Sequence, residues 1–145
     1  MSARQISATR TIATTPEVIF ELLADPAKHP LLDGSGTVRA AREGNPERLS
    51  LGAKFGMDMK IGASYKILNT VVEFEENRLI AWRHFNGHRW RWRLNPLPDG
   101  STEVTETFDW STARSPLLIS LSPFPRKNRA GIRKTLDRLA EMFPG

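Results

Sequence analysis

Residues 79–94 read LIAWRHFNGHRWRWRL, two short runs that flank the dipeptide Asn86-Gly87. Asparagine and glycine tolerate positive φ at both central positions of a type I′ turn, so this stretch predicts a β-hairpin. Beyond the turn, tryptophan and leucine alternate with arginine, the period-2 pattern of a strand with one dry face and one wet face. The hairpin therefore predicts which side chains of the sheet point inward.

A two-residue turn also predicts the register of the hairpin, because directly opposed residues share one face of a sheet. It would place Arg83 opposite Trp90 and Ala81 opposite Trp92. The expected inner face then carries Leu79, Ala81, Arg83, Phe85, His88, Trp90, Trp92 and Leu94. The expected outer face carries Ile80, Trp82, His84, Arg89, Arg91 and Arg93, with Arg91 in a cation–π stack on Trp82.

The neighbouring strands extend this inner face. A turn at Glu76-Asn77 would bring in Leu68, Thr70, Val72 and Phe74. The alternation of residues 102–110 adds Val104, Phe108 and Trp110 and takes Glu106 inward beside Trp92. The predicted face is therefore largely apolar, with three ionisable side chains: Arg83, His88 and Glu106.

These inner-face residues permit two interpretations each. Because a lone buried charge is costly, either Arg83 and Glu106 form a structural ion pair or Arg83 extends to the rim with its charge in water. The alternative is that the two side chains orient the polar group of an apolar ligand. Trp90 and Trp92 either fill a core or wall a cavity. His88 is either a solvated residue at the sheet edge or a general base.

The remaining pattern predicts an α+β architecture. A strand over 4–12 precedes a helix that starts at Thr14-Thr15-Pro16 and ends at Asp25-Pro26. One more short helical turn is expected over residues 26–32. We expect His29 either in the loop after the first helix or at the rim of a pocket. Strand-length pieces follow at 38–42, 54–59, 65–75, 78–85, 88–94 and 102–110. Residues 128–143 form an amphipathic helix with Leu136 on its apolar face. Helices over one face of an antiparallel sheet make an α+β domain.

Composition narrows the class of protein. A length of 145 residues suits one domain, 1–145. The chain has no cysteine, which excludes disulfides and thiolate nucleophiles, and its start lacks the apolar run of a signal peptide, so we expect a cytoplasmic protein. The net charge of +5 is scattered, which favours a role in solubility. Phosphate-binding, dinucleotide and metal-ligand patterns are missing, so we expect no cofactor and no metal.

Residues 12–26, IATTPEVIFELLADP, resemble the opening of the polyketide cyclase/dehydrase-like branch of the START-like (SRPBCC) superfamily. Residues 71–83 resemble its mid-sheet hairpin and residues 135–140 its terminal helix, so the resemblance covers nearly the whole chain. It implies a helix-grip fold: a curved antiparallel sheet of about six to seven strands wrapped around a long C-terminal helix. One or two short helices would separate the first two strands. The superfamily has no universal catalytic motif, so no catalytic role is transferred.

Three functions follow from the pattern and the resemblance. The first is binding of a lipid, polyketide or aromatic molecule in a cavity between sheet and helix, where we expect Thr70, Arg83, His88, Trp90, Trp92, Glu106, Phe108 and Leu136. The second is a cyclase, dehydratase or hydrolase in the same cavity, with Glu106 or His88 as acid or base and Arg83 holding an oxyanion. The third is nucleic-acid binding through the arginines of residues 89–93 and Trp82, the less favoured partner class. A homodimer is compatible with each.

Overall fold

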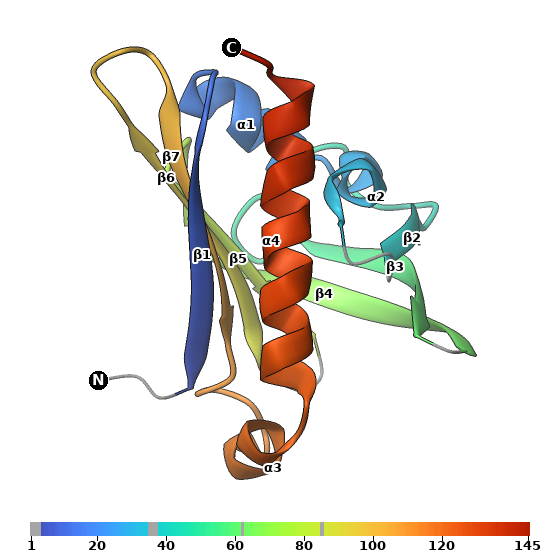
Figure 1. Cartoon of the computed structure of the whole chain (residues 1–145). Helices are drawn as coiled ribbons and strands as arrows, with labels where there is room; N and C mark the ends of the chain where they lie inside the picture. The colour runs from blue at the N-terminus through green and yellow to red at the C-terminus, as the bar shows by residue number, and fades with distance from the viewer. Residues whose placement is uncertain (1–3, 35–37, 62, 85) are drawn as a thin grey trace.

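The structure is a computed structural model that describes residues 4–34, 38–61, 63–84 and 86–145. Across these ranges, seven strands form one antiparallel sheet in the order β1-β7-β6-β5-β4-β3-β2. In chain order the elements are β1 (Gln5–Ile12), α1 (Pro16–Leu23), η1 (Pro26–Lys28), α2 (His29–Leu32), β2 (Val38–Ala41), β3 (Lys54–Ile61), β4 (Ala63–Glu75), β5 (Leu79–Arg83), β6 (Arg89–Pro96), β7 (Thr102–Asp109), α3 (Pro116–Leu121) and α4 (Phe124–Met142). Figure 1 shows the sheet curving around α4, so the predicted helix-grip fold is confirmed.

Helix α4 covers the inner face of the sheet. Ile132, Leu136 and Leu139 are buried on the side of the helix that faces the strands, as their spacing predicts. An ion pair between Arg10 of β1 and Asp137 of α4 joins the helix to the strand beside it. The helix begins four residues before the predicted start, because a proline is compatible with the first turn of a helix and Pro125 therefore does not block it.

The register of the central hairpin differs from the prediction by one residue. Trp82 lies opposite Trp90, and Arg83 lies opposite Arg89. The strands are joined by residues 84–88 rather than by two residues, and the N–H of Gly87 donates to the carbonyl of His84 at 2.9 Å. The turn therefore closes one position earlier than a type I′ turn at Asn86-Gly87 would.

This one-residue shift in register exchanges the inward and outward side chains of β5, because side chains alternate between the two faces of a strand. The predicted faces of β6 are right, with Trp92 and Leu94 buried on the inner side. On β5 they are wrong: Ile80 and Trp82 point inward, while Arg83 is exposed on the outer face. The predicted stack of Arg91 on Trp82 is therefore wrong as well. Phe85, also expected inside, lies outside the described residues.

A β-bulge changes the faces of β4. The register shifts between Val71 and Glu73, so one extra residue interrupts the alternation. Phe74 points inward as predicted, opposite Ile80. Beyond the bulge, Val71 and Asn69 are buried, whereas Leu68 is 57% exposed. The predicted inward positions of Leu68 and Thr70 are therefore wrong, and Thr70 lies opposite the exposed Arg83 on the outer face.

The outer face of the sheet carries a network of ion pairs. Glu73 of β4 accepts hydrogen bonds from Arg89 at 2.8 Å and from Arg91 at 2.8 and 2.9 Å. Arg91 also donates to Asp109 of β7 at 3.2 Å, and Gln5 of β1 donates to the same carboxylate at 3.0 Å. The hydrogen bonds from Arg91 lower the pKa of Glu73. The network thus links four strands on the side away from α4.

Candidate functional site

The inner face carries a row of aromatic rings across three strands. Trp82 of β5 lies opposite Trp90 of β6, which lies opposite Phe108 of β7. We call these three residues the aromatic row. The rings of Trp90 and Phe108 have centroids 4.9 Å apart, and Trp110 stacks on Phe108 at 5.4 Å. Trp82 and Trp90 are only half-buried, so this row offers apolar surface within the fold.

Glu106 lies one step along the strands from the aromatic row. It sits opposite Trp92 and beside Ala8, as the alternation of β7 predicts, and only 7% of it is exposed. Burial raises the pKa of Glu106 well above its usual range, and the charge of Asp33 raises it further. This setting favours the protonated carboxyl, which can donate one hydrogen bond and accept others.

Two polar atoms at this point are buried and lack partners among the residues that the structure describes. They are Oε1 of Glu106 and the indole Nε1 of Trp92, from directly opposed residues. A buried donor or acceptor without a partner costs roughly 1–3 kcal/mol, so native proteins rarely leave one unless a ligand or water completes it. The pair therefore marks the polar point of an otherwise apolar face.

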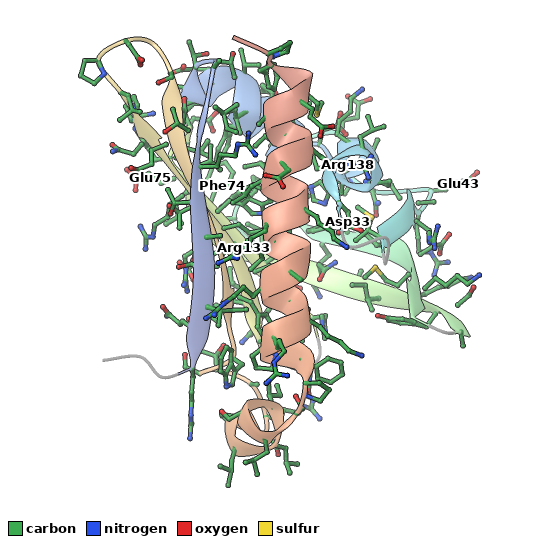
Figure 2. All side chains as sticks on the ribbon, viewed as in Figure 1. Asp33, Glu43, Phe74, Glu75, Arg133 and Arg138 are labelled. Carbon is green, nitrogen blue, oxygen red and sulfur yellow. The ribbon has the colours of Figure 1, made fainter. Side chains whose placement is uncertain are left out.

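The loop after α2 lies close to Glu106 and is held against α4. The carbonyl of Asp33 accepts a hydrogen bond from Arg138 at 2.8 Å, and Figure 2 shows both residues beside α4. The N–H of Gly34 donates to Thr135 Oγ1 at 2.9 Å. A Cβ on Gly34 would lie 2.5 Å from the backbone nitrogen of Thr135, so only glycine permits this approach.

His88 lies at the end of the aromatic row. Its ring contacts Phe108 at 5.1 Å and His84 at 4.2 Å between centroids. Burial, and next the proximity of His84, lower the pKa of His88 to about 4, so the ring is neutral at pH 7. Its Nδ1 is buried with no hydrogen-bond partner in the described ranges. His88 is therefore half-buried, not the solvated edge residue that one interpretation expected.

His29 is a core residue, not a loop or rim residue. It is buried, and its Nε2–H donates to the carbonyl of Leu23 at 2.7 Å, which fixes the tautomer. Its ring stacks on Trp82 with centroids 4.8 Å apart. Burial lowers its pKa to about 4.

The predicted site residues separate into two groups. Trp90, Trp92, Glu106 and Phe108 share the inner face, His88 lies at its end, and Leu136 faces it from α4. Arg83 and Thr70 lie on the outer face, so an ion pair between Arg83 and Glu106 is wrong. Sequence reasoning missed Trp82, Asn69 and Asp33 as inner-side residues. The length of the turn between β5 and β6 determines the face of Trp82, and the bulge in β4 determines the face of Asn69. No pattern in the sequence indicates that Asp33 lies near Glu106.

Open concavities of about 470 and 560 Å³ lie around the connection between β2 and β3. Polar residues line them, including Arg42 and Asn45 in both and Lys66 in the first. They differ from the aromatic inner face in position and in chemistry. Within the described ranges, no group of three or more histidine, aspartate or glutamate side chains is placed to hold a metal ion.

The geometry removes the basis for a stacking surface that binds nucleic acid. That hypothesis needs Trp82 on the same face as the arginines of β6. Trp82 instead packs inside against His29, while Arg89 and Arg91 are bound to Glu73. Arg89 and Arg91 therefore link β6 to β4 on the outer face of the sheet.

Comparisons with known proteins agree with this fold. A family model described as "Polyketide cyclase / dehydrase and lipid transport" matches residues 3–143. The uncharacterized protein Rv0088 of Mycobacterium tuberculosis is 37% identical over 147 residues. That match covers 96% of this chain, and the chain spans 64% of the length of that curated relative.

Solved structures share the fold at low sequence identity. The solution structure of an AHSA1-like protein from Aeromonas hydrophila has a TM-score of 0.66 at 21% identity and covers 94% of this chain and 90% of its own. The solution structure of the Aha1 dimer from Colwellia psychrerythraea has a TM-score of 0.69 at 14% identity and covers 96% and 95%. At this level of identity the likeness concerns the fold alone.

Proposed function

Since this chain belongs to the polyketide cyclase / dehydrase and lipid transport family, we propose that it binds an apolar small molecule on the inner face of its sheet. The molecule lies along the aromatic row beneath α4 and turns its polar group toward Glu106 and Trp92. The observation that carries the proposal is the pair of buried, unpartnered polar atoms on Glu106 and Trp92 within an aromatic face.

The chemistry of this pair favours an uncharged oxygen on the ligand. The protonated carboxyl of Glu106 and the indole N–H of Trp92 are both donors, and a carbonyl oxygen has two lone pairs to accept them. A ligand carboxylate is disfavoured, because the charge of Asp33 already raises the pKa of Glu106. Rings or acyl chains suit the aromatic row, since binding pockets are mostly apolar with a few placed polar groups. The proposed class is therefore ketones, esters, phenols and similar neutral molecules.

A binding assay with variants at Glu106 tests this proposal. Tryptophan fluorescence is followed while a panel of neutral polyketides, phenols and fatty esters is titrated, and native mass spectrometry detects a co-purified molecule. Glu106→Gln keeps an uncharged donor and acceptor, so we expect affinity close to that of the wild type. Glu106→Leu removes both and should weaken binding about ten-fold.

The matched control is Glu103→Leu, which changes an exposed glutamate on the same strand. It should bind as the wild type does. Failure of every panel member to bind, or equal affinity in wild type and Glu106→Leu, contradicts the proposal. Thermal denaturation of each variant establishes that a loss of binding is not a loss of folding.

The raised pKa of Glu106 favours a second candidate, dehydration in the same place. A protonated carboxyl beside the aromatic row can give its proton to a leaving hydroxyl group, which departs as water. The neutral His88 can accept the proton from the adjacent carbon as the double bond forms. Glu106→Gln separates the two functions, because it should abolish turnover of a β-hydroxy ketone and leave binding intact. Unchanged turnover in Glu106→Gln and in His88→Ala rejects these roles.

A further inference from the structure

Exposed apolar side chains gather at the end of the molecule where α3 meets α4. Among the described residues, Leu117, Leu118 and Leu121 of α3 are 62%, 66% and 77% exposed, and Phe124 at the start of α4 is 50% exposed. We call these four residues the α3 cap. Figure 1 shows α3 beyond the end of the sheet, at the N-terminal end of α4. Single exposed leucines are common, but four within eight residues form a patch that indicates an interaction site.

The sequence that surrounds the α3 cap carries charge of one sign. The chain contains no aspartate or glutamate between Asp109 and Asp137. The same stretch contains six exposed cations: Arg114, Arg126, Lys127, Arg129, Arg133 and Lys134. An apolar patch whose flanking sequence carries only cations complements an anionic lipid surface, because the apolar side chains enter the headgroup boundary while the cations attract the anionic lipids.

Hydrogen bonds and one buried side chain fix the orientation of α3, so that the α3 cap faces solvent. The Nε1–H of Trp110 donates to Ser120 Oγ at 2.8 Å, and the backbone N–H of Phe124 donates to Ser122 Oγ at 3.2 Å. Ile119 is the buried residue of α3, so the opposite side of this short helix is presented to solvent. Trp110 also stacks on Phe108, so this one side chain contacts both α3 and the aromatic row.

We propose that the α3 cap docks on an anionic bilayer surface, with its leucines and Phe124 in the headgroup region. None of the helices in the described part of the chain is long and apolar enough to span a membrane, so the proposed contact is peripheral. The docking does not depend on the identity or existence of the ligand proposed above.

Vesicle co-sedimentation tests the docking. The full chain is mixed with vesicles of phosphatidylcholine alone or of phosphatidylcholine with phosphatidylglycerol. We expect binding to the anionic vesicles that weakens as salt is added. The double change Leu118→Ser with Leu121→Ser should weaken it about ten-fold. Arg126→Gln with Lys127→Gln should weaken it about five-fold for each charge removed.

Matched controls change equally exposed residues elsewhere. Leu51→Ser with Leu68→Ser removes two exposed leucines, and Arg39→Gln with Lys60→Gln removes two exposed cations far from the cap in sequence. Both should bind as the wild type does. Absence of binding to anionic vesicles, or equal loss in the control variants, overturns the proposal.

The lack of cysteine in the chain allows a second, position-specific readout. A single Leu118→Cys variant carries an environment-sensitive fluorophore, and Leu68→Cys carries the same label as control. Addition of anionic vesicles should shift the emission of the label at position 118 to shorter wavelength and leave that at position 68 unchanged. A shift that depends on protein concentration without vesicles would mean that the cap contacts a second copy, and it would overturn the membrane proposal.

Discussion

Glu106 places an ionisable group where its charged form is unfavourable. Its folded pKa lies above the unfolded value of 4.5, so the folded state binds the proton more tightly than the unfolded chain does. Stability contributed by this proton is present at low pH and is lost as pH rises from the unfolded pKa through the folded one. The same carboxyl that we propose as the ligand's polar contact therefore makes the protein less stable as pH rises.

We predict that Glu106→Gln removes this dependence. The variant should gain thermal stability over the wild type progressively as pH rises above about 4.5, because glutamine stays neutral. Melting temperatures of both proteins measured across a pH series check the prediction. Glu103→Gln on the exposed side of the same strand should follow the wild type. Parallel curves for wild type and Glu106→Gln would mean that Glu106 titrates normally.

The loop after α2 approaches α4 closely at one residue, Gly34. A Cβ at Gly34 would meet backbone atoms of α4, which cannot move without displacing the helix. We expect Gly34→Ala to lower the free energy of unfolding by about 1–3 kcal/mol, measured by urea denaturation. At Gly56 the three atoms nearest to an added Cβ belong to the flexible side chain of Arg42, so Gly56→Ala should have a smaller effect. Equal losses would contradict the proposed close contact.

The ion-pair network on the outer face supports the sheet across its strands. Arg91 holds Glu73 and Asp109, and all three side chains are less than one-third exposed. Replacing Arg91 by methionine removes one charged partner from each carboxylate, which leaves Glu73 with Arg89 and Asp109 with Gln5 and Ser111. We therefore expect a loss of about 2 kcal/mol in the free energy of unfolding. Arg93→Met, on the same strand and the same face but exposed, should change it by less than about 0.5 kcal/mol. Similar effects of the two changes would show that the network contributes little.

Hydrophobic periodicity predicts where the strands of the sheet lie, but it predicts the inward and outward faces of β4 and β5 wrongly. The alternation within β6 and β7 correctly placed Trp92 and Glu106 together, because it depends only on neighbours along one strand. Arg83 and Thr70 were misplaced because their faces depend on the connection before or after them. One extra residue, in a turn or in a bulge, reverses every side chain beyond it.

For the whole molecule, the contact between α4 and the sheet decides how much of the inner face is core. Leu136 is buried there, so Leu136→Ala should lower the free energy of unfolding by about 2–5 kcal/mol in chemical denaturation. Leu68→Ala removes an exposed leucine of β4 and should change it by less than about 0.5 kcal/mol. A small effect of Leu136→Ala would mean that this side chain lines open space instead of filling the interior.

The sequence by itself determined the architecture of this protein: the order of elements, the helix that the sheet surrounds and the inward position of Glu106 beside Trp92. These follow from local chemistry, because hydrophobic periodicity and turn residues act over a few positions. Only the tertiary structure decided that Trp82 joins the aromatic row, that Arg83 leaves it, and that Asp33 approaches Glu106. Those placements depend on turn length, on a bulge and on a loop held against a distant helix. Local pattern does not encode such long-range packing.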